Sequence, residues 1–301
     1  MTRHFLSTTD LSAAEQGRVI DLARASIGSL GEPLLGRGVA LIFEKPSNRT
    51  RHSMEMAVVQ LGGHPVYTRG EEIGLDVREP IEDVAAVMSG YHAVIGARVF
   101  AHSTVERLAK ASTVPVVNML SDLQHPLQAL ADILTMVEEF GSLAGKTVAY
   151  VGDYNNVARS LAQASALSGS HIRIGCPLGY HPSSQELDQL RSLGAASVTY
   201  VESMDAAVEG AHAVHTDTWT SMGQEAESAR RERDFAGWTV TASTMARAEN
   251  AAIFMHCLPA HRGMEVAPDV IDGPSSRIVR QAHNRMHAAR GLLAFLMEVN
   301  S

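Results

Sequence analysis

The sequence predicts an α/β protein built from two doubly wound parallel-sheet domains that are joined by a connecting helix. Three observations predict this fold. Short apolar segments alternate with amphipathic segments, the alternation is interrupted once near the middle, and the chain has 301 residues. Strands that alternate with helices are typical of parallel sheets covered by helices, and this length is typical of two domains.

The first series of elements lies before residue 141. The apolar run "GVALIFE" indicates a buried strand, and a helix should follow it because apolar residues recur from Met54 to Leu61 at the i, i+3, i+4, i+7 spacing. The expected strands are 38–44, 64–68, 93–99 and 114–120, and further helices are expected at 80–90, 103–112 and 125–140.

The stretch "GSLAGK", residues 141–146, interrupts the pattern, and a second alternating series follows it. We therefore expect one domain at 1–140 and another at 141–301, with the helix at 125–140 as the connector. The second set of strands is expected within 147–153, 171–177, 197–203, 212–218 and 252–259. The last stretch, 278–299, should be a helix, and the pattern leaves open whether it packs back on the first domain.

Composition excludes several classes of function. The formal net charge is −8, from 25 basic and 33 acidic residues, whereas nucleic acids and anionic membranes are bound by basic surfaces. No run approaches the ~20 apolar residues of a membrane span, and the N-terminus has no apolar core of a secretory signal. Only Cys176 and Cys257 are present, which favours a reducing cytoplasm.

The stretch "SNRTR", residues 47–51, indicates an anion site. It lies between a predicted strand and a predicted helix, and the first N–H groups of a helix attract anions. Ser47, Asn48 and Thr50 add neutral donors, while Arg49 and Arg51 add planar forks that suit phosphate oxygens. Taken alone, the stretch is also compatible with helix capping and solvated charges.

Other polar clusters also follow predicted strands, where open α/β sheets bind their ligands. These clusters are Arg98, His125–Gln128, Asp153–Asn156, Asp217–Gly223 and His256–Arg262. The cluster after residue 151 lacks the glycines of a dinucleotide-binding turn, which disfavours an NAD-dependent enzyme.

Five motifs resemble the aspartate/ornithine carbamoyltransferase family. "FEKPSNRTR" is similar to its carbamoyl phosphate motif and "HPLQALADILT" to its His-Pro-x-Gln motif. The stretches "DTWTSMG", "FMHCLPAHRG" and "NRMHA" resemble the ornithine branch in particular. The motifs follow the family's order over residues 43–287. The resemblance implies transfer of a carbamoyl group from carbamoyl phosphate to the δ-amine of ornithine, with no cofactor and no metal.

The resemblance also implies roles for individual residues. Carbamoyl phosphate would be bound by Ser47, Asn48, Arg49, Thr50, Arg98, His125, Gln128, Leu258 and Arg285. Ornithine would be bound by Asn156, Asp217, Ser221, Met222 and Cys257, with Asn155 as the alternative to Asn156. The residues placed in catalysis are Arg49, His125, Gln128, Asp217 and Cys257.

Two features of this expected site stay open. The resemblance implies that Cys257 positions the reactive amine rather than acting as a nucleophile. Whether Asp217, Cys257 or solvent removes the proton from that amine is left undecided.

The chain departs from the family pattern at several positions. Asn48 replaces a threonine, and His283 stands where a glutamate is common. Glu72 stands where many members have a glutamine that reaches a neighbouring subunit; Arg69 or Arg78 would then serve instead, or the alignment slips here. A homotrimer, or a multiple of trimers, remains the expected assembly. The alternatives are another amine acceptor, such as putrescine, acetylornithine or aspartate, and a non-catalytic descendant of the fold.

Overall fold

The computed structural model describes residues 2–221 and 224–300, which form two compact units. Unit 1 consists of Met1–Leu134 together with His283–Ser301, and unit 2 consists of Thr135–Ala282. The division thus falls inside the helix that we expected as the connector, six residues before the predicted boundary. The end of the chain returns to unit 1, whereas the predicted boundaries assigned it to the second domain.

Unit 1 is built on a parallel sheet of four strands in the order β2-β1-β3-β4. The strands are β1 (Gly38–Phe43), β2 (His64–Arg69), β3 (His92–Arg98) and β4 (Val116–Leu120). From β1 the chain passes to β2 on one side and then to β3 on the other. Open α/β sheets bind ligands beyond the carboxyl ends of strands at such a reversal, so the end of β1 and the end of β3 are where a site is expected.

Helices cover both faces of this sheet. They are α1 (Ala13–Arg24), α2 (Ile27–Leu30), α3 (Asn48–Gln60), α4 (Gly70–Ile73), α5 (Ile81–Tyr91), α6 (His102–Ala111), α7 (Pro126–Phe140), α14 (Ile278–Val299) and the 3-10 turn η1 (Thr8–Asp10). One core cluster joins α5 and α6 to the sheet, and the other joins α1, α3 and the C-terminal part of α14 to it. Both faces are therefore covered, which explains why the inner strands β1 and β3 read as apolar runs, whereas the edge strand β2 is only partly buried.

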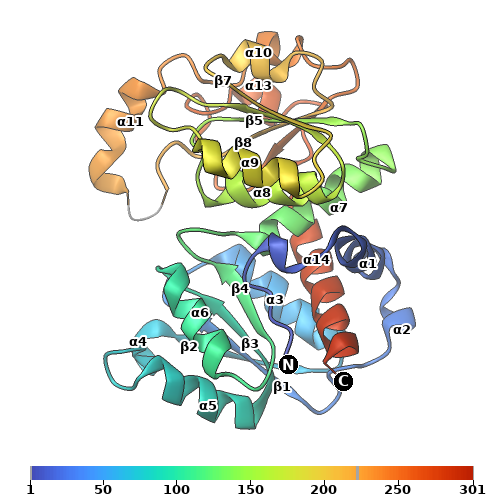
Figure 1. Cartoon of the computed structure of the whole chain (residues 1–301), viewed down its shortest axis with the longest axis vertical. Coiled ribbons are helices and arrows are strands. Elements are labelled where there is room, and N and C mark those ends of the chain that lie inside the picture. The colour runs from blue at the N-terminus through green and yellow to red at the C-terminus, as the bar shows by residue number, and fades with distance from the viewer. Residues whose placement is uncertain (1, 222–223, 301) are drawn as a thin grey trace. The chain divides into compact units, whose positions relative to one another are not determined.

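The C-terminal part of α14 packs against α1 within unit 1 (Figure 1). Leu292, Leu293 and Leu296 are almost completely buried there. Gly291 permits the close approach, because a Cβ atom at this position would lie 2.6 Å from both the Val19 oxygen and the Ala23 nitrogen. The question that the pattern left open is thereby answered: the last helix packs back on the first unit.

Unit 2 is built on a parallel sheet of five strands in the order β7-β6-β5-β8-β9. The strands are β5 (Thr147–Val151), β6 (His171–Gly175), β7 (Ser197–Val201), β8 (Ala213–Thr216) and β9 (Ile253–His256). The helices are α8 (Asn156–Leu167), α9 (Ser184–Ser192), α10 (Met204–Val208), α11 (Ser228–Asp234), α12 (Ala242–Met245), α13 (Pro268–Ile271) and the 3-10 turn η2 (Glu225–Glu227). The order reverses between β5 and β8, which places the stretches after these two strands at the second expected site.

The predicted α/β fold with two parallel sheets is confirmed. The strand at 38–44 ends one residue early, and the helix predicted at 278–299 has the observed bounds. Among residues 2–221 and 224–300, no helix combines the length and the apolar character that crossing a bilayer requires.

Candidate functional site

In unit 1, the stretch that suggested an anion site forms the first turn of α3. Ser47 is the N-cap, and its hydroxyl accepts a hydrogen bond from the Thr50 N–H at 3.3 Å. This serine is favoured at a helix start because its oxygen satisfies one of the N–H groups that have no partner inside the helix. The positive end of the helix dipole therefore lies beside the residues that follow β1.

Two buried arginines converge on the hydroxyl of Thr50. Arg98, at the end of β3, donates to the Thr50 Oγ1 at 3.3 Å, and Arg285, from α14, donates to the same atom at 3.1 Å. Both arginines are 4% exposed and Thr50 is 1% exposed. Like charges that are buried together repel each other, so this arrangement favours an anion, which would offset both charges.

Arg285 also joins this cluster to the start of α7. Its other Nη donates to the Gln128 Oε1 at 2.6 Å, and the amide of Gln128 donates to the Asp132 Oδ1 at 2.7 Å. Gln128 and Asp132 are one helical turn apart, so their side chains lie on the same face of α7. The guanidinium fork thus fixes an amide beside the arginine cluster.

His125, directly before α7, is buried in the field of these arginines. The pKa of His125 lies well below its usual value, first because burial penalises the imidazolium and then because Arg285, Arg98 and Arg49 are positively charged. The imidazole is therefore neutral at pH 7, and a neutral ring can donate a hydrogen bond from one nitrogen without adding charge.

The rest of the predicted carbamoyl phosphate motif is more accessible. Arg49 is half-buried and Asn48 is exposed in the first turn of α3. Arg51, which we expected to add a second fork, instead donates to Glu55 at 2.8 Å and lies over the ring of Tyr67, 3.8 Å from its centroid. An acidic partner one turn away explains this orientation.

Glu72 does not extend toward a ligand within its own unit. Its carboxylate accepts from the Arg69 N–H at 3.0 Å and so caps the short helix α4, while its backbone oxygen accepts from Arg78 at 2.9 Å. The loop is held further by Arg107, which contacts both Asp76 and Glu82. Arg78, one of the expected substitutes for the missing glutamine, is thus engaged in the loop itself.

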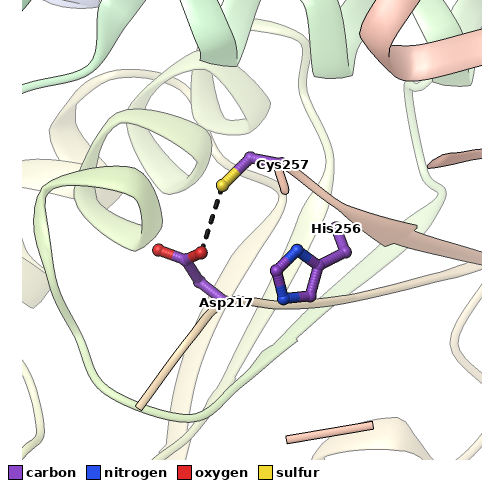
Figure 2. A group of neighbouring side chains, drawn as sticks. All are labelled: Asp217, His256 and Cys257. Carbon is purple, nitrogen blue, oxygen red and sulfur yellow. Dashed lines mark hydrogen bonds between the residues drawn. The ribbon is translucent and has the colours of Figure 1, made fainter. Parts of the chain in front are cut away.

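In unit 2, a second cluster gathers beyond the ends of β5, β8 and β9. Asn155 is the N-cap of α8; its Oδ1 accepts from the N–H groups of residues 157 and 158, and its Nδ2 donates to the Asp217 Oδ2 at 2.8 Å. The thiol of Cys257 donates to the other oxygen, Oδ1, at 3.1 Å (Figure 2). Asp217 is 5% exposed, so its carboxylate is shielded from solvent, and these two donors fix its orientation.

This cluster can recognise a cationic group and does not resemble a nucleophile site. Reactive cysteines have cationic neighbours that stabilise the thiolate, whereas the Cys257 thiol donates to a carboxylate. A buried carboxylate attracts an ammonium group strongly, because opposite charges interact more strongly away from water.

Asp217, His256 and Cys257 also bring metal-ligand atoms within 4.8 Å of one another (Figure 2). The donor set suits zinc, but the His256 ring is directed toward protein groups. Its Nδ1 accepts the Leu258 N–H at 2.9 Å, and its Nε2 lies 3.3 Å from the Glu265 Oε1. A cation would have to displace one of these contacts, so the residues do not fit a metal site well.

The remaining predicted acceptor residues lie on the same edge of the sheet or outside the described residues. Asn156 is the first residue of α8 and is half-buried, and Ser221 follows the Asp217 segment. Leu258, which we expected to bind carbamoyl phosphate, follows β9 with a positive φ of 61°. Met222 lies outside the described residues. Asn155 is the alternative to Asn156, and its amide donates a hydrogen bond to Asp217.

The structure adds residues that sequence reasoning missed. Arg231 of α11 is 6% exposed and donates to the Asp153 Oδ2 at 2.7 Å and to the Trp219 oxygen at 3.0 Å. It also contacts Glu227 at 3.0 Å, and so ties the segment after Asp217 to the end of β5. No signal in the sequence separates Arg231 from its neighbours Arg230 and Arg233, because only burial distinguishes them.

Comparison with known proteins identifies the chain over nearly its whole length. Residues 3–138 match the family model described as aspartate/ornithine carbamoyltransferase, carbamoyl-P binding domain, and residues 144–296 match the Asp/Orn binding domain of the same family. The chain is 47% identical over 304 residues to the ornithine carbamoyltransferase of Acidothermus cellulolyticus, covering 99% of this chain and 97% of that protein.

Solved structures agree with this match. The crystal structure of ornithine carbamoyltransferase from Thermus thermophilus superposes with a TM-score of 0.90 at 41% identity, and 99% of each chain is covered. The Pyrococcus furiosus ornithine carbamoyltransferase gives a TM-score of 0.93 at 42% identity, covering 98% of this chain and 97% of that one. The resemblance drawn from the five motifs is confirmed, and the chain belongs to the aspartate/ornithine carbamoyltransferase family.

Proposed function

We propose that this protein transfers the carbamoyl group of carbamoyl phosphate to the δ-amine of L-ornithine and releases L-citrulline and phosphate. The observation that carries the proposal is the convergence of Arg98 and Arg285 on Thr50 at the N-terminus of α3. A buried pair of guanidinium groups at a helix start is suited to a phosphate dianion, and the family match supplies the reaction.

Carbamoyl phosphate is assigned to unit 1. Its phosphate would be held by the first turn of α3, including Ser47, Asn48 and Arg49, together with Arg98 and Arg285. Its carbonyl oxygen would accept hydrogen bonds from His125 and Gln128. The neutral state of His125 supports this role, because a neutral imidazole donates a hydrogen bond and does not compete with the arginines for the phosphate.

L-Ornithine is assigned to unit 2. The α-amino group would pair with Asp217, and the α-carboxylate would be bound by Asn156 or by the accessible part of Asn155. Ser221, Met222 and Cys257 complete the expected ornithine set, and Leu258 is the remaining expected ligand of carbamoyl phosphate. The support for Asp217 is its buried carboxylate, whose two oxygens are oriented by Asn155 and Cys257.

The proposed step is direct acyl transfer. The neutral δ-amine attacks the carbonyl carbon, the new C–N bond forms, the C–O bond to phosphate breaks, and the phosphate leaves with the electron pair of that bond. The proton that the nitrogen loses goes to Asp217, either directly or through the Cys257 thiol, which passes its own proton on, or it goes to solvent. Donors aimed at the carbonyl oxygen stabilise the charge that develops there. The donor is already activated, so the step requires neither a metal nor an organic cofactor.

The direct test combines the purified protein with carbamoyl phosphate and L-ornithine and measures citrulline and phosphate. We expect the two products in equal amounts, with phosphate release in excess of the spontaneous rate only when ornithine is present. Phosphate release that does not depend on ornithine would contradict the proposal, because it would indicate hydrolysis rather than transfer.

We further propose a cytoplasmic homotrimer, or a multiple of trimers, on the basis of the family resemblance. The residue at the position of the family's glutamine is Glu72, and its carboxylate caps a helix in its own loop. We therefore propose that this side chain does not contribute to the active site of a neighbouring subunit. Light scattering checks the assembly, and a mass of one or two chains would contradict it.

A further inference from the structure

Directly behind Cys257 and Leu258, unit 2 contains a histidine and a glutamate that are both 0% exposed. The Nε2 of His256, the last residue of β9, lies 3.3 Å from the Oε1 of Glu265, which directly precedes the bridge residue Val266. Two ionisable side chains are rarely buried completely without a purpose, and the roles proposed above use neither of them.

The hydrogen bond at the other ring nitrogen determines which tautomer His256 adopts. The Leu258 N–H donates to Nδ1 at 2.9 Å, so Nδ1 accepts and carries no proton. A neutral imidazole has one N–H, which must then be at Nε2, facing the carboxylate of Glu265. The carboxylate stabilises this tautomer, because its negative charge attracts the Nε2–H and would repel a lone pair there.

The backbone that receives this bond has an unusual conformation. Leu258 has a φ of 61°, a left-handed conformation that costs a residue with a branched side chain free energy and persists only where its surroundings impose it. The bond from its N–H to His256 is one such constraint. A second contact holds the start of the turn, because the His256 N–H donates to the Gln281 Oε1 at 2.9 Å.

We propose that Glu265 and His256 are positioning residues for the acceptor amine. Glu265 holds the Nε2–H tautomer of His256, the Nδ1 of His256 then holds the Leu258 N–H, and the resulting turn directs the Leu258 carbonyl and the Cys257 thiol. This inference rests on the proposed function, since it assigns these two groups to the δ-amine of ornithine.

The contacts around the pair restrict it to this orientation. His261, which is 51% exposed, lies 3.7 Å from the second oxygen of Glu265, and the backbone N–H of His261 donates to Oε1 at 2.5 Å. On the far side, the amide of Gln281 that holds the His256 N–H also contacts the His215 Nε2 at 3.1 Å. The imidazole and the carboxylate therefore both have their partners on the loop from 257 to 265, while the backbone N–H of His256 is bound to α14.

The first experiment reads the tautomer. The wild-type protein, labelled with 15N at histidine, is examined by NMR, and the His256 signals are assigned by their loss in His256→Asn. We expect the nitrogen shifts of the Nε2–H tautomer at pH 7. A proton on Nδ1 in the wild type would overturn the inference whatever the variants do.

The second experiment compares Glu265→Gln with Asp272→Asn. Both replace a carboxylate with an amide of the same size, but Asp272 pairs with Arg262 at the surface, where ion pairs contribute little. In Glu265→Gln, the amide N–H₂ can donate to Nε2 and shift the proton to Nδ1, so Leu258 loses its acceptor. We expect kcat/KM for ornithine to fall about tenfold, because the net contribution of one hydrogen bond corresponds to about that factor. The KM for carbamoyl phosphate should be unchanged.

The outcomes separate the inference from the function on which it rests. A wild-type protein that makes no citrulline refutes the proposed function. An active wild type with Glu265→Gln kinetics equal to those of Asp272→Asn overturns the positioning role. If Glu265→Gln does not fold, Glu265→Asp replaces it: the shorter acid keeps the charge, so the Nε2–H tautomer should persist, and a shift to Nδ1–H would contradict the account.

Discussion

Replacement of Asn155 separates helix capping from acceptor recognition in a single side chain. Its Oδ1 caps α8 through two backbone N–H groups, at 3.0 and 3.1 Å, while its Nδ2 donates to Asp217 at 2.8 Å. Serine is about as good an N-cap as asparagine, but its side chain ends one atom earlier and carries no amide. Asn155→Ser should therefore keep the cap and lose the bond to Asp217, and Asn155→Ala should lose both.

The expected magnitudes follow from these contacts. A hydrogen bond to a charged group contributes about 1.5–3 kcal/mol, which corresponds to roughly 10- to 150-fold in an equilibrium constant at about 1.4 kcal/mol per tenfold. Both variants should lose affinity for ornithine within this range. Both variants lose the bond to the buried Asp217 and should be less stable than the wild type. Loss of the cap costs about 1 kcal/mol more, so Asn155→Ala should be less stable than Asn155→Ser by about that amount.

The assay measures steady-state citrulline formation with each substrate varied in turn, and urea unfolding of the same samples. We expect the KM for ornithine to rise in both variants. The KM for carbamoyl phosphate should change less than about threefold, which is well below the effect of losing one hydrogen bond to a charged group. The reasoning would be refuted if Asn155→Ser kept the wild-type KM for ornithine, or if both KM values rose together.

Four further outcomes are expected. Arg285→Lys loses the fork that joins Gln128 to Thr50, so the KM for carbamoyl phosphate should rise about tenfold or more in steady-state kinetics, with a smaller change for ornithine. Arg231→Met leaves Asp153 buried without its partner and should lower the free energy of unfolding by about 3–5 kcal/mol in urea; Asp153→Asn in the same chain should restore part of it. Gly291→Val forces a side chain against the α1 backbone at 2.6 Å, and loss of about 1–3 kcal/mol of stability is expected. Burial depresses the pKa of His125, so below about pH 6.5 the unfolded chain binds a proton that the folded chain does not. The free energy of unfolding should therefore decrease by up to about 1.4 kcal/mol for each unit by which the pH is lowered. His125→Gln should remove this dependence, as urea unfolding at several pH values would show.

The position of the site could be predicted from strand ends, but the partners of its residues could not. Arg98 and Asp217 lie at the ends of apolar runs that the sequence predicts as strands. In each sheet, this end lies where the chain stops adding strands on one side and begins to add them on the other. The contact between Arg285 and Thr50 joins positions 235 residues apart. No periodicity reports such a pair, and only the family resemblance indicated that Arg285 belongs there.

The choice between Asn155 and Asn156 depended on where α8 begins. The side chain of an N-cap residue folds back on the helix start, whereas the side chain of the first helical residue does not. A shift of the helix start by one residue therefore exchanges the roles of the two asparagines. The pattern fixes helix starts only to within a few residues, and the two amides are chemically identical. Similarly, the capping role of Glu72 follows from the short helix α4, which the sequence analysis did not predict.

The central claim is that the Asp217 cluster recognises an α-amino acid and delivers its δ-amine to carbamoyl phosphate. Comparing kcat/KM for L-ornithine with that for putrescine, which lacks the α-carboxylate, tests it most directly, with N-acetylornithine and aspartate as further acceptors. The account predicts that ornithine exceeds putrescine by at least about tenfold, the value of one charge-assisted contact, and that citrulline is the main product. Equal or faster carbamoylation of putrescine would contradict the account.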